Sequence, residues 1–302
     1  LPSFSARTCE QYHLLSEDHY DFIYAERQLL GDLHRVLQKL DGSKEDLDLV
    51  HDLRSRIDDL FMVVVVGEFN AGKSTFINSL LGDKYLKSGV LPTTDRICLL
   101  RSDMEGSSEM KGDFVREAGS ADSLTWKRSD HLMLEDVEEL VVKGADWLQP
   151  GVALVDTPGT NALMSRHEYL SKVIVPRADL ILFVTSAERP MSESECAFLS
   201  RIADWGKKVV ICLNKKDIVS ESEIKDVEEY VKLSAASRLQ YTSGKVPVFS
   251  VSSARALEAK LASKGGSGSE SAPSKDAVQR LYESSGIEAF ETYLASTLGR
   301  EE

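Results

Sequence analysis

A run of four valines, Val63 to Val66, leads into the string GEFNAGKS and then into an apolar helical pattern. Gly67 and Gly72 bracket the loop, and Lys73 and Ser74 follow it directly. The spacing G-x-x-x-x-G-K-S is that of a phosphate-binding P-loop. Its glycines let backbone N–H groups surround phosphate oxygens, and the dipole of the following helix favours anions. We expect Lys73 to contact the β- and γ-phosphates and the Ser74 hydroxyl to bind Mg²⁺.

The rest of the loop should hold phosphates mainly through its backbone. Asn70 occupies a position at which potassium-activated GTPases hold a monovalent cation against the phosphates, so it is a candidate catalytic residue beside Lys73. A side chain that bonds its own loop backbone is the alternative for Asn70, and the sequence leaves both open. The expected nucleotide contacts in this segment are Gly67, Asn70, Ala71, Gly72, Lys73, Ser74 and Thr75.

A second group of polar residues follows the strand-like run 152–155 in the string LVDTPGTN. Asp156 at the end of that run can hold Mg²⁺ through water, and the Gly159 N–H can meet the γ-phosphate. Between the P-loop and Asp156 lies GVLPTTDRI, which offers a threonine to sense Mg²⁺ and the γ-phosphate. Thr93 and Thr94 are both candidates, and we prefer Thr94 as a metal ligand and catalytic residue.

Base recognition is indicated by the string CLNKKDIV, which contains N-K-x-D after another apolar run. The Asp217 carboxylate would accept the two N–H groups of a guanine edge, which adenine does not present. Asn214 would brace the loop, and the Lys215 stem would lie on the base plane. The string VSSA follows the next strand, and a backbone N–H from Ser252, Ser253 or Ala254 would meet the guanine oxygen.

The water-positioning glutamines of familiar GTPases are missing. Ras-type enzymes carry one directly after D-x-x-G, where this chain has Thr160. Dynamins proper carry one two residues after the first P-loop glycine, where this chain has Phe69. A cation held by Asn70 could offset transition-state charge, and a second G domain could close over the nucleotide and exclude water.

Composition argues against several classes of protein, although a local basic patch could still exist. The 302 residues include 36 basic and 49 acidic ones, which gives a formal net charge of −13. This balance argues against a nucleic-acid partner and against a polybasic membrane surface. No apolar run approaches the ~18 residues of a membrane span, so this chain is expected to be soluble, and no leader segment is recognisable. Cys9, Cys98, Cys196 and Cys212 lack metal-ligand spacing, and Cys98 and Cys212 are expected to be core thiols.

The elements that position these motifs alternate between strand-like and helical patterns. This alternation predicts an α/β fold: a P-loop GTPase domain with a mostly parallel central sheet flanked by helices, plus a helical neck segment. We expect amphipathic neck helices over 1–60, the GTPase domain over 61–262 and a flexible, Gly/Ser-rich linker over 263–276, with 101–123 as a hairpin or insertion. The last segment, 277–302, is expected to be a C-terminal helix of the GTPase domain or neck, with its helical pattern over 277–298. The strands are expected at 63–66, 97–100, 152–155, 180–185, 208–213 and 246–250.

The connecting strings resemble the dynamin superfamily, in particular the branch of bacterial dynamin-like proteins and mitofusins. They include GEFNAGKSTFINSLLG, GVLPTTDR, LVDTPGTN and VPRADLILFVTSAERPMSESECAFL. The strings at 85–87 and 175–179, together with SSARALEAKL, are especially similar to the fuzzy-onion-like dynamins of plant and algal chloroplasts. The resemblance covers about 60–261 and the flanking helices.

The resemblance implies GTP hydrolysis with Mg²⁺, coupled to a nucleotide-dependent homodimer of G domains. It also implies remodelling or fusion of a thylakoid or inner chloroplast membrane, which the full-length protein would contact through a stalk and tip that this chain lacks. Two alternatives remain: a potassium-dependent assembly GTPase acting on the ribosome or RNA, and a scaffold that binds nucleotide without hydrolysing it.

Overall fold

The computed structural model of the chain places the elements that the sequence predicts and adds others. The structure describes residues 17–40, 42–57, 61–86, 97–102, 127–128, 137–142, 148, 152–157, 174–239, 246–264 and 274–298, and the fold is that of these described residues.

The centre of the molecule is an eight-stranded sheet with the order β3-β4-β2-β5-β1-β6-β7-β8. Its middle is parallel: β1 (Phe61–Val66) lies between β5 (Val152–Asp156) and β6 (Leu180–Ser186). Two further parallel strands, β7 (Lys208–Asn214) and β8 (Val248–Ser250), extend it at one edge. The predicted mostly parallel α/β fold is therefore confirmed, and all six predicted strands are present.

The other edge of the sheet differs in direction. There β2 (Ile97–Ser102) pairs antiparallel with β5 and parallel with β4 (Val137–Val142). The edge strand β3 (Lys127–Arg128) pairs antiparallel with β4. We did not predict β3 or β4 from the sequence. The first is only two residues long, and the second, VEELVV, carries two adjacent glutamates that interrupt its apolar pattern.

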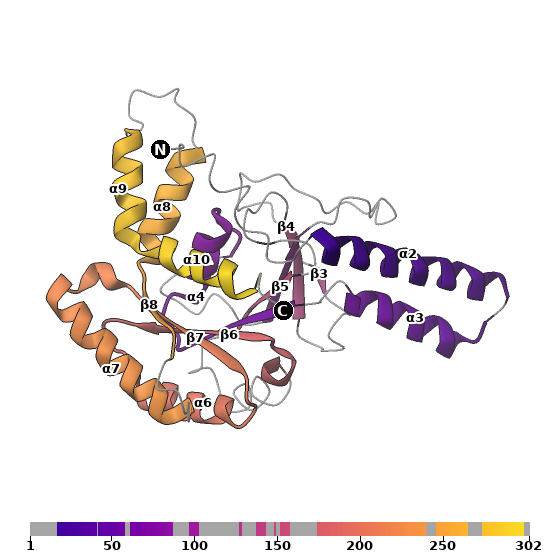
Figure 1. Cartoon of the computed structure of the whole chain (residues 1–302), viewed down its shortest axis with the longest axis horizontal. Coiled ribbons are helices and arrows are strands. Elements are labelled where there is room, and N and C mark those ends of the chain that lie inside the picture. Colours follow the sequence, from indigo (N-terminus) through magenta and orange to yellow (C-terminus); the bar gives the residue numbers. More distant parts are fainter. Residues whose placement is uncertain are drawn as a thin grey trace.

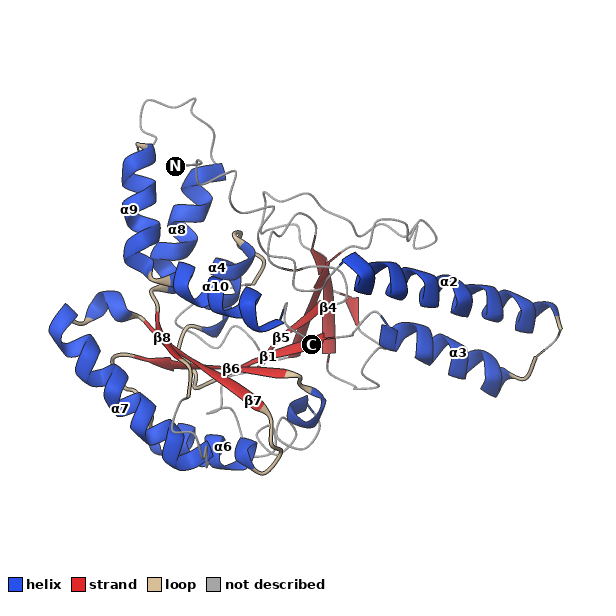
Figure 2. Cartoon of the chain, viewed as in Figure 1, coloured by secondary structure: helices blue, strands red, loops and turns tan. Residues whose placement is uncertain are grey.

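Helices cover both faces of the sheet (Figures 1 and 2). On one face lie α4 (Lys73–Leu81), α8 (Ser253–Lys264), α9 (Lys275–Ser285) and α10 (Ile287–Leu298). On the other lie α6 (Glu193–Ala203) and α7 (Glu221–Leu239). Alternate valines of β1 belong to the two hydrophobic clusters, which explains why the strand is apolar without interruption. Two short 3₁₀ turns, η3 (Val175–Arg177) and η4 (Lys216–Ile218), complete the connections.

The C-terminal segment is two helices, so the prediction of one continuous helix was wrong. Gly286 has a φ of 72° and ends α9, which lets α10 turn back across the sheet. The ring of Phe290 then packs edge-on against Phe76, with 5.2 Å between centroids, and against Phe249 at 5.6 Å. These helices therefore share the hydrophobic cluster of β1 and α4.

A helical hairpin precedes the sheet and projects sideways from it (Figure 1). It consists of α2 (Glu17–Lys39) and α3 (Lys44–Ile57), and the Ser43 hydroxyl accepts a hydrogen bond from the Asp46 N–H at 3.1 Å, as a cap of α3 should. The hairpin leaves large apolar side chains exposed: Phe22, Leu29, Leu33, Val36, Leu40, Leu49 and Leu53.

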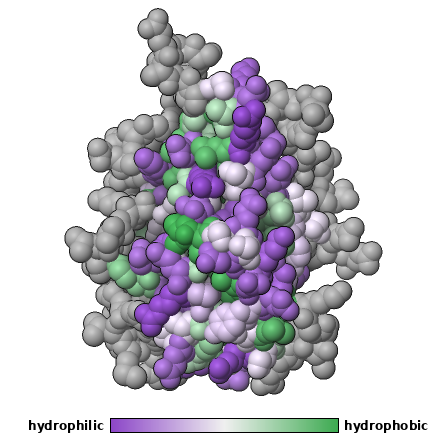
Figure 3. Space-filling model, turned by 90° about the vertical axis from the view of Figure 1, so that its left-hand side faces the viewer, coloured by the Kyte–Doolittle hydropathy of each residue, from purple (hydrophilic) through white to green (hydrophobic). Residues whose placement is uncertain are grey.

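None of the described helices has both the length and the apolarity that crossing a bilayer requires. Cys98 and Cys212 are buried thiols in the core, as predicted, and Cys9 lies outside the described residues. The expected insertion at 101–123 falls almost entirely outside them, as do residues 265–273 of the expected linker. Figure 3 shows a mixed surface on the side of the molecule that it views, where hydrophilic residues separate smaller hydrophobic patches.

Candidate nucleotide-binding site

The predicted polar motifs gather at one edge of the sheet. Because β1, β5, β6 and β7 are parallel, their carboxyl ends lie at the same edge, where open α/β sheets bind ligands. The loop 67–72 follows β1, Asp156 ends β5, and the string 214–217 begins at the end of β7. Residues far apart in the sequence thus form one site.

The backbone of the P-loop requires glycine at both of its ends. Gly67 has a φ of 153°, and a Cβ there would lie 2.1 Å from the carbonyl oxygen of Val184 in β6. Gly72 has a φ of 91°, and its Cβ would lie 2.3 Å from Nδ2 of Asn214. At these two positions the loop therefore runs against β6 and Asn214 with no room for a side chain, and it opens directly into α4.

Lys73 is the first residue of α4 and is 7 % exposed. Its Nζ donates hydrogen bonds to the carbonyl oxygens of Gly67, at 3.1 Å, and Glu68, at 2.9 Å. Burial lowers the pKa of Lys73, while the negative charges of Asp156, Glu195 and Glu68 oppose this shift. The ammonium group is thus held at the loop by carbonyls that a phosphate oxygen could replace.

A magnesium site is supported by an unsatisfied carboxylate oxygen. The Ser74 hydroxyl donates to Oδ2 of Asp156 at 2.9 Å, and Oδ1 of Asp156 is buried without a hydrogen-bond partner among the described residues. Burial raises the pKa of Asp156 to about 6, although Lys73 and Ser74 favour the ionised form. A buried carboxylate beside a hydroxyl is the oxygen environment that Mg²⁺ prefers, so Ser74 and Asp156 fit this ion.

This arrangement predicts a pH dependence of metal-assisted binding. Mg²⁺ needs the ionised Asp156, so below the pKa of about 6 the metal must displace a proton. We expect the gain in nucleotide affinity on adding Mg²⁺ to fall by up to about tenfold per pH unit below pH 6. Labelled GDP titrated with Mg²⁺ or with chelator, from pH 5 to pH 8, measures this gain. An equal gain at pH 5 and pH 7 would contradict the assignment.

Asn214 ties the phosphate end of the site to the base end. Its Nδ2 donates to the carbonyl oxygen of Ala71 in the P-loop at 2.9 Å. Its Oδ1 accepts from the N–H of Ser253 at 3.1 Å and from the Ser253 hydroxyl at 2.8 Å. Asn214 is 2 % exposed, so the side chain acts as an internal brace between two loops.

Two of the groups predicted to recognise the base have no hydrogen-bond partner among the described residues. Within the described part of the chain, the Asp217 carboxylate has no hydrogen-bond partner. The N–H of Ser252 donates to the Ser285 carbonyl at 2.8 Å, and that of Ser253 is used by Asn214. Of the three backbone donors expected to meet the guanine oxygen, the Ala254 N–H is therefore the available one among the described residues. Lys215 is left-handed, with a φ of 62°, and its Nζ contacts Glu188 at 2.9 Å.

The turn between α9 and α10 also supports the base loops, which we did not predict. Ser285 supplies the carbonyl for Ser252, and a Cβ on Gly286 would lie 2.5 Å from Nζ of Lys216 and 2.7 Å from the Ser250 oxygen. A glycine inside an otherwise helical pattern was the available signal for this turn.

Several predicted residues lie outside the described residues: Thr93, Thr94, Gly159 and Thr160. Thr75 lies in the first turn of α4 and is partly buried. Asn70 is exposed, has a φ of 64°, and its side chain has no hydrogen bond to a described residue. In the described part of the chain, the Asn70 side chain therefore makes no hydrogen bond to its own loop backbone, which was one of the two alternatives for this residue.

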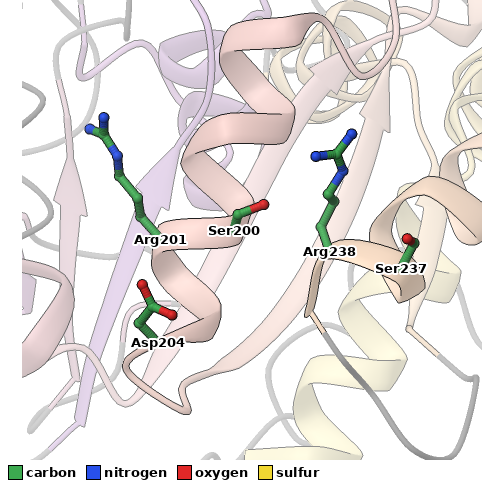
Figure 4. A pocket seen from close by; sticks show the side chains of 5 residues that line it. All are labelled: Ser200, Arg201, Asp204, Ser237 and Arg238. Atoms are coloured by element: carbon green, nitrogen blue, oxygen red, sulfur yellow. The ribbon is translucent and has the colours of Figure 1, made fainter.

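A cavity of about 410 Å³ lies elsewhere, lined by Ser200, Arg201, Asp204, Ser237 and Arg238 (Figure 4). Its residues come from the C-terminal ends of α6 and α7. Both helices begin at the nucleotide edge and run back across the sheet, so this cavity lies at the opposite edge. Figure 4 shows the two arginine side chains on separate helices, well apart from one another.

Comparisons with known proteins agree with this geometry. The model of the Dynamin family matches residues 63–217, which include the P-loop, Asp156 and Asp217. A probable transmembrane GTPase, FZO-like and chloroplastic, from Arabidopsis thaliana is 38 % identical over 244 residues, which are 78 % of this chain and 24 % of that protein. A bacterial dynamin-like protein from Nostoc punctiforme is 31 % identical over 220 residues, 67 % of this chain and 31 % of that one. The chain thus spans a third or less of the length of each.

A solved structure of an oligomerised bacterial dynamin pair has a similar fold. It has a TM-score of 0.56 and 21 % identity, and the match covers 92 % of this chain and 43 % of that one. The family match covers more than half of this chain and includes the P-loop, the predicted magnesium ligands Ser74 and Asp156, and the predicted base-recognition string. The chain belongs to the dynamin family, and it carries the GTPase domain of that family.

Proposed function

We propose that this chain binds and hydrolyses GTP with Mg²⁺ at the carboxyl edge of its sheet. The observation that carries the proposal is the Asn214 brace, because it holds the phosphate loop beside the base-recognition loops. The Asp217 carboxylate and the Ala254 N–H, which belong to the base-recognition loops, have no hydrogen-bond partners among the described residues. A guanine base would donate its N–H groups to the Asp217 carboxylate and accept a hydrogen bond from the Ala254 N–H with its oxygen.

Each described residue has a separate role in this proposal. Lys73 exchanges its two loop carbonyls for β- and γ-phosphate oxygens and neutralises charge that develops on them. Ser74 and Asp156 would hold Mg²⁺, which supplies further charge neutralisation when bound. Thr94 and the Gly159 N–H, which lie outside the described residues, would sense the γ-phosphate.

Hydrolysis must proceed without a glutamine at the usual positions. Phe69, at one of these positions, is 37 % exposed at the rim of the site and offers no polar group. We propose that a potassium ion held by Asn70 and a second G domain take over charge stabilisation and exclusion of water. Phe69 and the half-exposed Ile218 are large apolar side chains on loops at the nucleotide edge, where a second G domain would close the site.

The proposed wider role is membrane remodelling or fusion by a longer chloroplast protein. The exposed apolar side chains of α2 and α3 support a role for this hairpin as a neck, since a helix pair with such a stripe normally packs on further helices. The name of the Arabidopsis relative supports the chloroplast, and the short span of this chain relative to it is why membrane contact is assigned to other parts.

The proposal predicts two dependences of the turnover rate. GTP turnover per molecule should rise with protein concentration, and potassium should support it better than sodium or a large inert cation. A cation in a water-excluded site can contribute several kcal/mol to transition-state stabilisation, so the effect of potassium should be about tenfold or more. Phosphate release at several protein concentrations in the three salts measures both.

Asn70→Ala is the variant that separates the two dependences. It should remove the difference between salts while GDP binding persists. Equal rates of the unmodified chain in all three salts would exclude the cation. A rate independent of concentration, together with a monomer in a transition-state mimic, would exclude the partner.

A further inference from the structure

The tetrapeptide S-E-S-E occurs twice, at 192–195 where α6 begins and at 220–223 where α7 begins. In both copies the first serine hydroxyl accepts from the backbone N–H of the last glutamate at 3.3 Å, and that glutamate accepts from the serine N–H at 3.1 Å and 3.0 Å. The two serine hydroxyls lie 3.1 Å apart in each copy. Both copies are therefore capping boxes with the same local geometry.

Among the described residues, the copy on α6 hydrogen-bonds to the P-loop and the copy on α7 does not. There the Glu68 carboxylate accepts a hydrogen bond from the Ser192 hydroxyl at 2.5 Å and another from the Ser194 hydroxyl. The corresponding serines of α7, Ser220 and Ser222, are exposed and contact their own helix start. The copy on α7 is therefore a capping box with local contacts alone, and the copy on α6 is the same capping box with two further hydrogen bonds to Glu68.

The environment of Glu195 is also changed by the P-loop. Glu195 is 1 % exposed, and its Oε2 accepts from the Thr185 hydroxyl at 2.9 Å. Burial raises its pKa to about 7, with the Glu68 charge adding to the shift. Among the described residues, the charged groups that interact with it are Glu68 and Lys73, and Glu195 in turn raises the pKa of Lys73. The matching glutamate of α7, Glu223, is exposed, and hydrogen bonds from Ser220 lower its pKa.

Glu68 is connected directly to the phosphate-binding machinery. Its carbonyl oxygen accepts from Nζ of Lys73 at 2.9 Å and from the N–H of Ala71 at 3.3 Å. Fixing the Glu68 side chain therefore fixes the carbonyl that holds the catalytic lysine and the following turn of the loop.

We propose that Glu68, bound to Ser192 and Ser194, is a positioning residue that anchors the P-loop on α6 and sets its affinity for nucleotide phosphates. Glu195, buried beneath this anchor, adds a proton-sensitive contribution. The proposal rests on the nucleotide site proposed above, and it goes beyond that site in naming a second set of residues that do not touch the nucleotide.

The charge of Glu195 decides whether phosphate affinity rises or falls with pH. When Glu195 ionises, its negative charge lies close to the loop that must bind phosphate. This charge repels the Glu68 carboxylate and competes with phosphate for the Lys73 ammonium group. Protonated Glu195 therefore favours phosphate binding, and affinity should weaken as pH rises through about 7. We expect this to contribute a loss of about fivefold between pH 6 and pH 8.

The duplicated tetrapeptide supplies matched controls. Labelled GDP binding should be measured for the unmodified chain, Glu68→Ala, Ser194→Ala and Glu195→Gln, with Ser222→Ala and Glu223→Gln as the controls on α7. Charge-assisted hydrogen bonds predict an increase in Kd of about tenfold for Glu68→Ala and about threefold for Ser194→Ala. Ser222→Ala should leave Kd unchanged. Ser194→Ala keeps the helix cap and the charge, so it separates the anchor from a folding defect.

The pH profile separates a positioning role from a merely structural one. The GDP affinity of Glu195→Gln should not show the fivefold loss between pH 6 and pH 8. The GDP affinity of Glu223→Gln should depend on pH as that of the unmodified chain does. Parallel profiles for Glu195→Gln and the unmodified chain would overturn the role of Glu195, and equal Kd values for Ser194→Ala and Ser222→Ala would overturn the anchor. Absence of GDP binding by the unmodified chain would instead overturn the nucleotide site itself, and the anchor with it.

Discussion

Asp217→Asn is expected to abolish the preference for guanine over adenine nucleotides. The Asp217 carboxylate has no partner among the described residues, so two N–H groups of a guanine edge would be its only strong donors. Losing a carboxylate that pairs buried donors costs on the order of 2–5 kcal/mol. We therefore expect GTP affinity to fall by a factor of about 30 or more, while ATP affinity changes little. Competition of GTP and ATP for labelled GDP measures the ratio.

The same variant should gain a new ligand. The asparagine carbonyl can still accept one N–H, and its amide can donate to the oxygen that xanthine carries in place of the guanine amino group. Xanthosine triphosphate should therefore bind the variant better than the unmodified chain. Asp226→Asn, an exposed carboxylate on α7, is the matched control and should keep guanine preference. Unchanged discrimination between GTP and ATP in Asp217→Asn would contradict the assignment.

Gly67→Ala is the second change with a large expected effect. A Cβ at Gly67 would lie 2.1 Å from the Val184 carbonyl oxygen, and neither atom belongs to a flexible side chain. The P-loop or β6 must shift, so we expect a loss of more than about 4 kcal/mol in the free energy of unfolding, or an altered loop that binds no nucleotide. Chemical denaturation and GDP titration measure the two outcomes.

Gly206→Ala is the control for backbone strain alone. Gly206 also has a positive φ, 61°, but a Cβ there would have no heavy atom of the described residues within 4 Å, its chain neighbours aside. It should cost only about 1–2 kcal/mol, which is the price of a left-handed alanine. If both variants bind GDP as well as the unmodified chain and lose equal stability, close packing of the P-loop on β6 does not matter.

The central part of the fold could be predicted from the sequence because local pattern and burial agree there. The valines of β1 face helices on both sides, so the strand needs an apolar residue at every position, and the pattern is unmistakable. The Ser43 cap and the glycines of the P-loop likewise follow from local geometry. At each of these positions the local structure alone requires that type of residue, so the residue type predicts the structure.

The parts that were missed depend on tertiary contacts. The strand β4 is interrupted by Glu138 and Glu139, and it is recognised only through its pairing with β2. Gly286 belongs to the base-recognition site because Lys216 and Ser250 lie against it, and those residues are distant in the sequence. Glu68 illustrates the same limit, since identical S-E-S-E strings give no indication of which one faces the P-loop.

The most direct test of the account is phosphate release from GTP by the unmodified chain and by Lys73→Ala, with Mg²⁺ and potassium present. Lys73 connects the parts of the predicted phosphate site, because it donates hydrogen bonds to Gly67 and Glu68 and interacts electrostatically with Asp156. The account predicts GTP turnover that increases with concentration, exceeds ATP turnover and disappears in Lys73→Ala. Phosphate release from GTP that is no greater than that of Lys73→Ala at any concentration would contradict it.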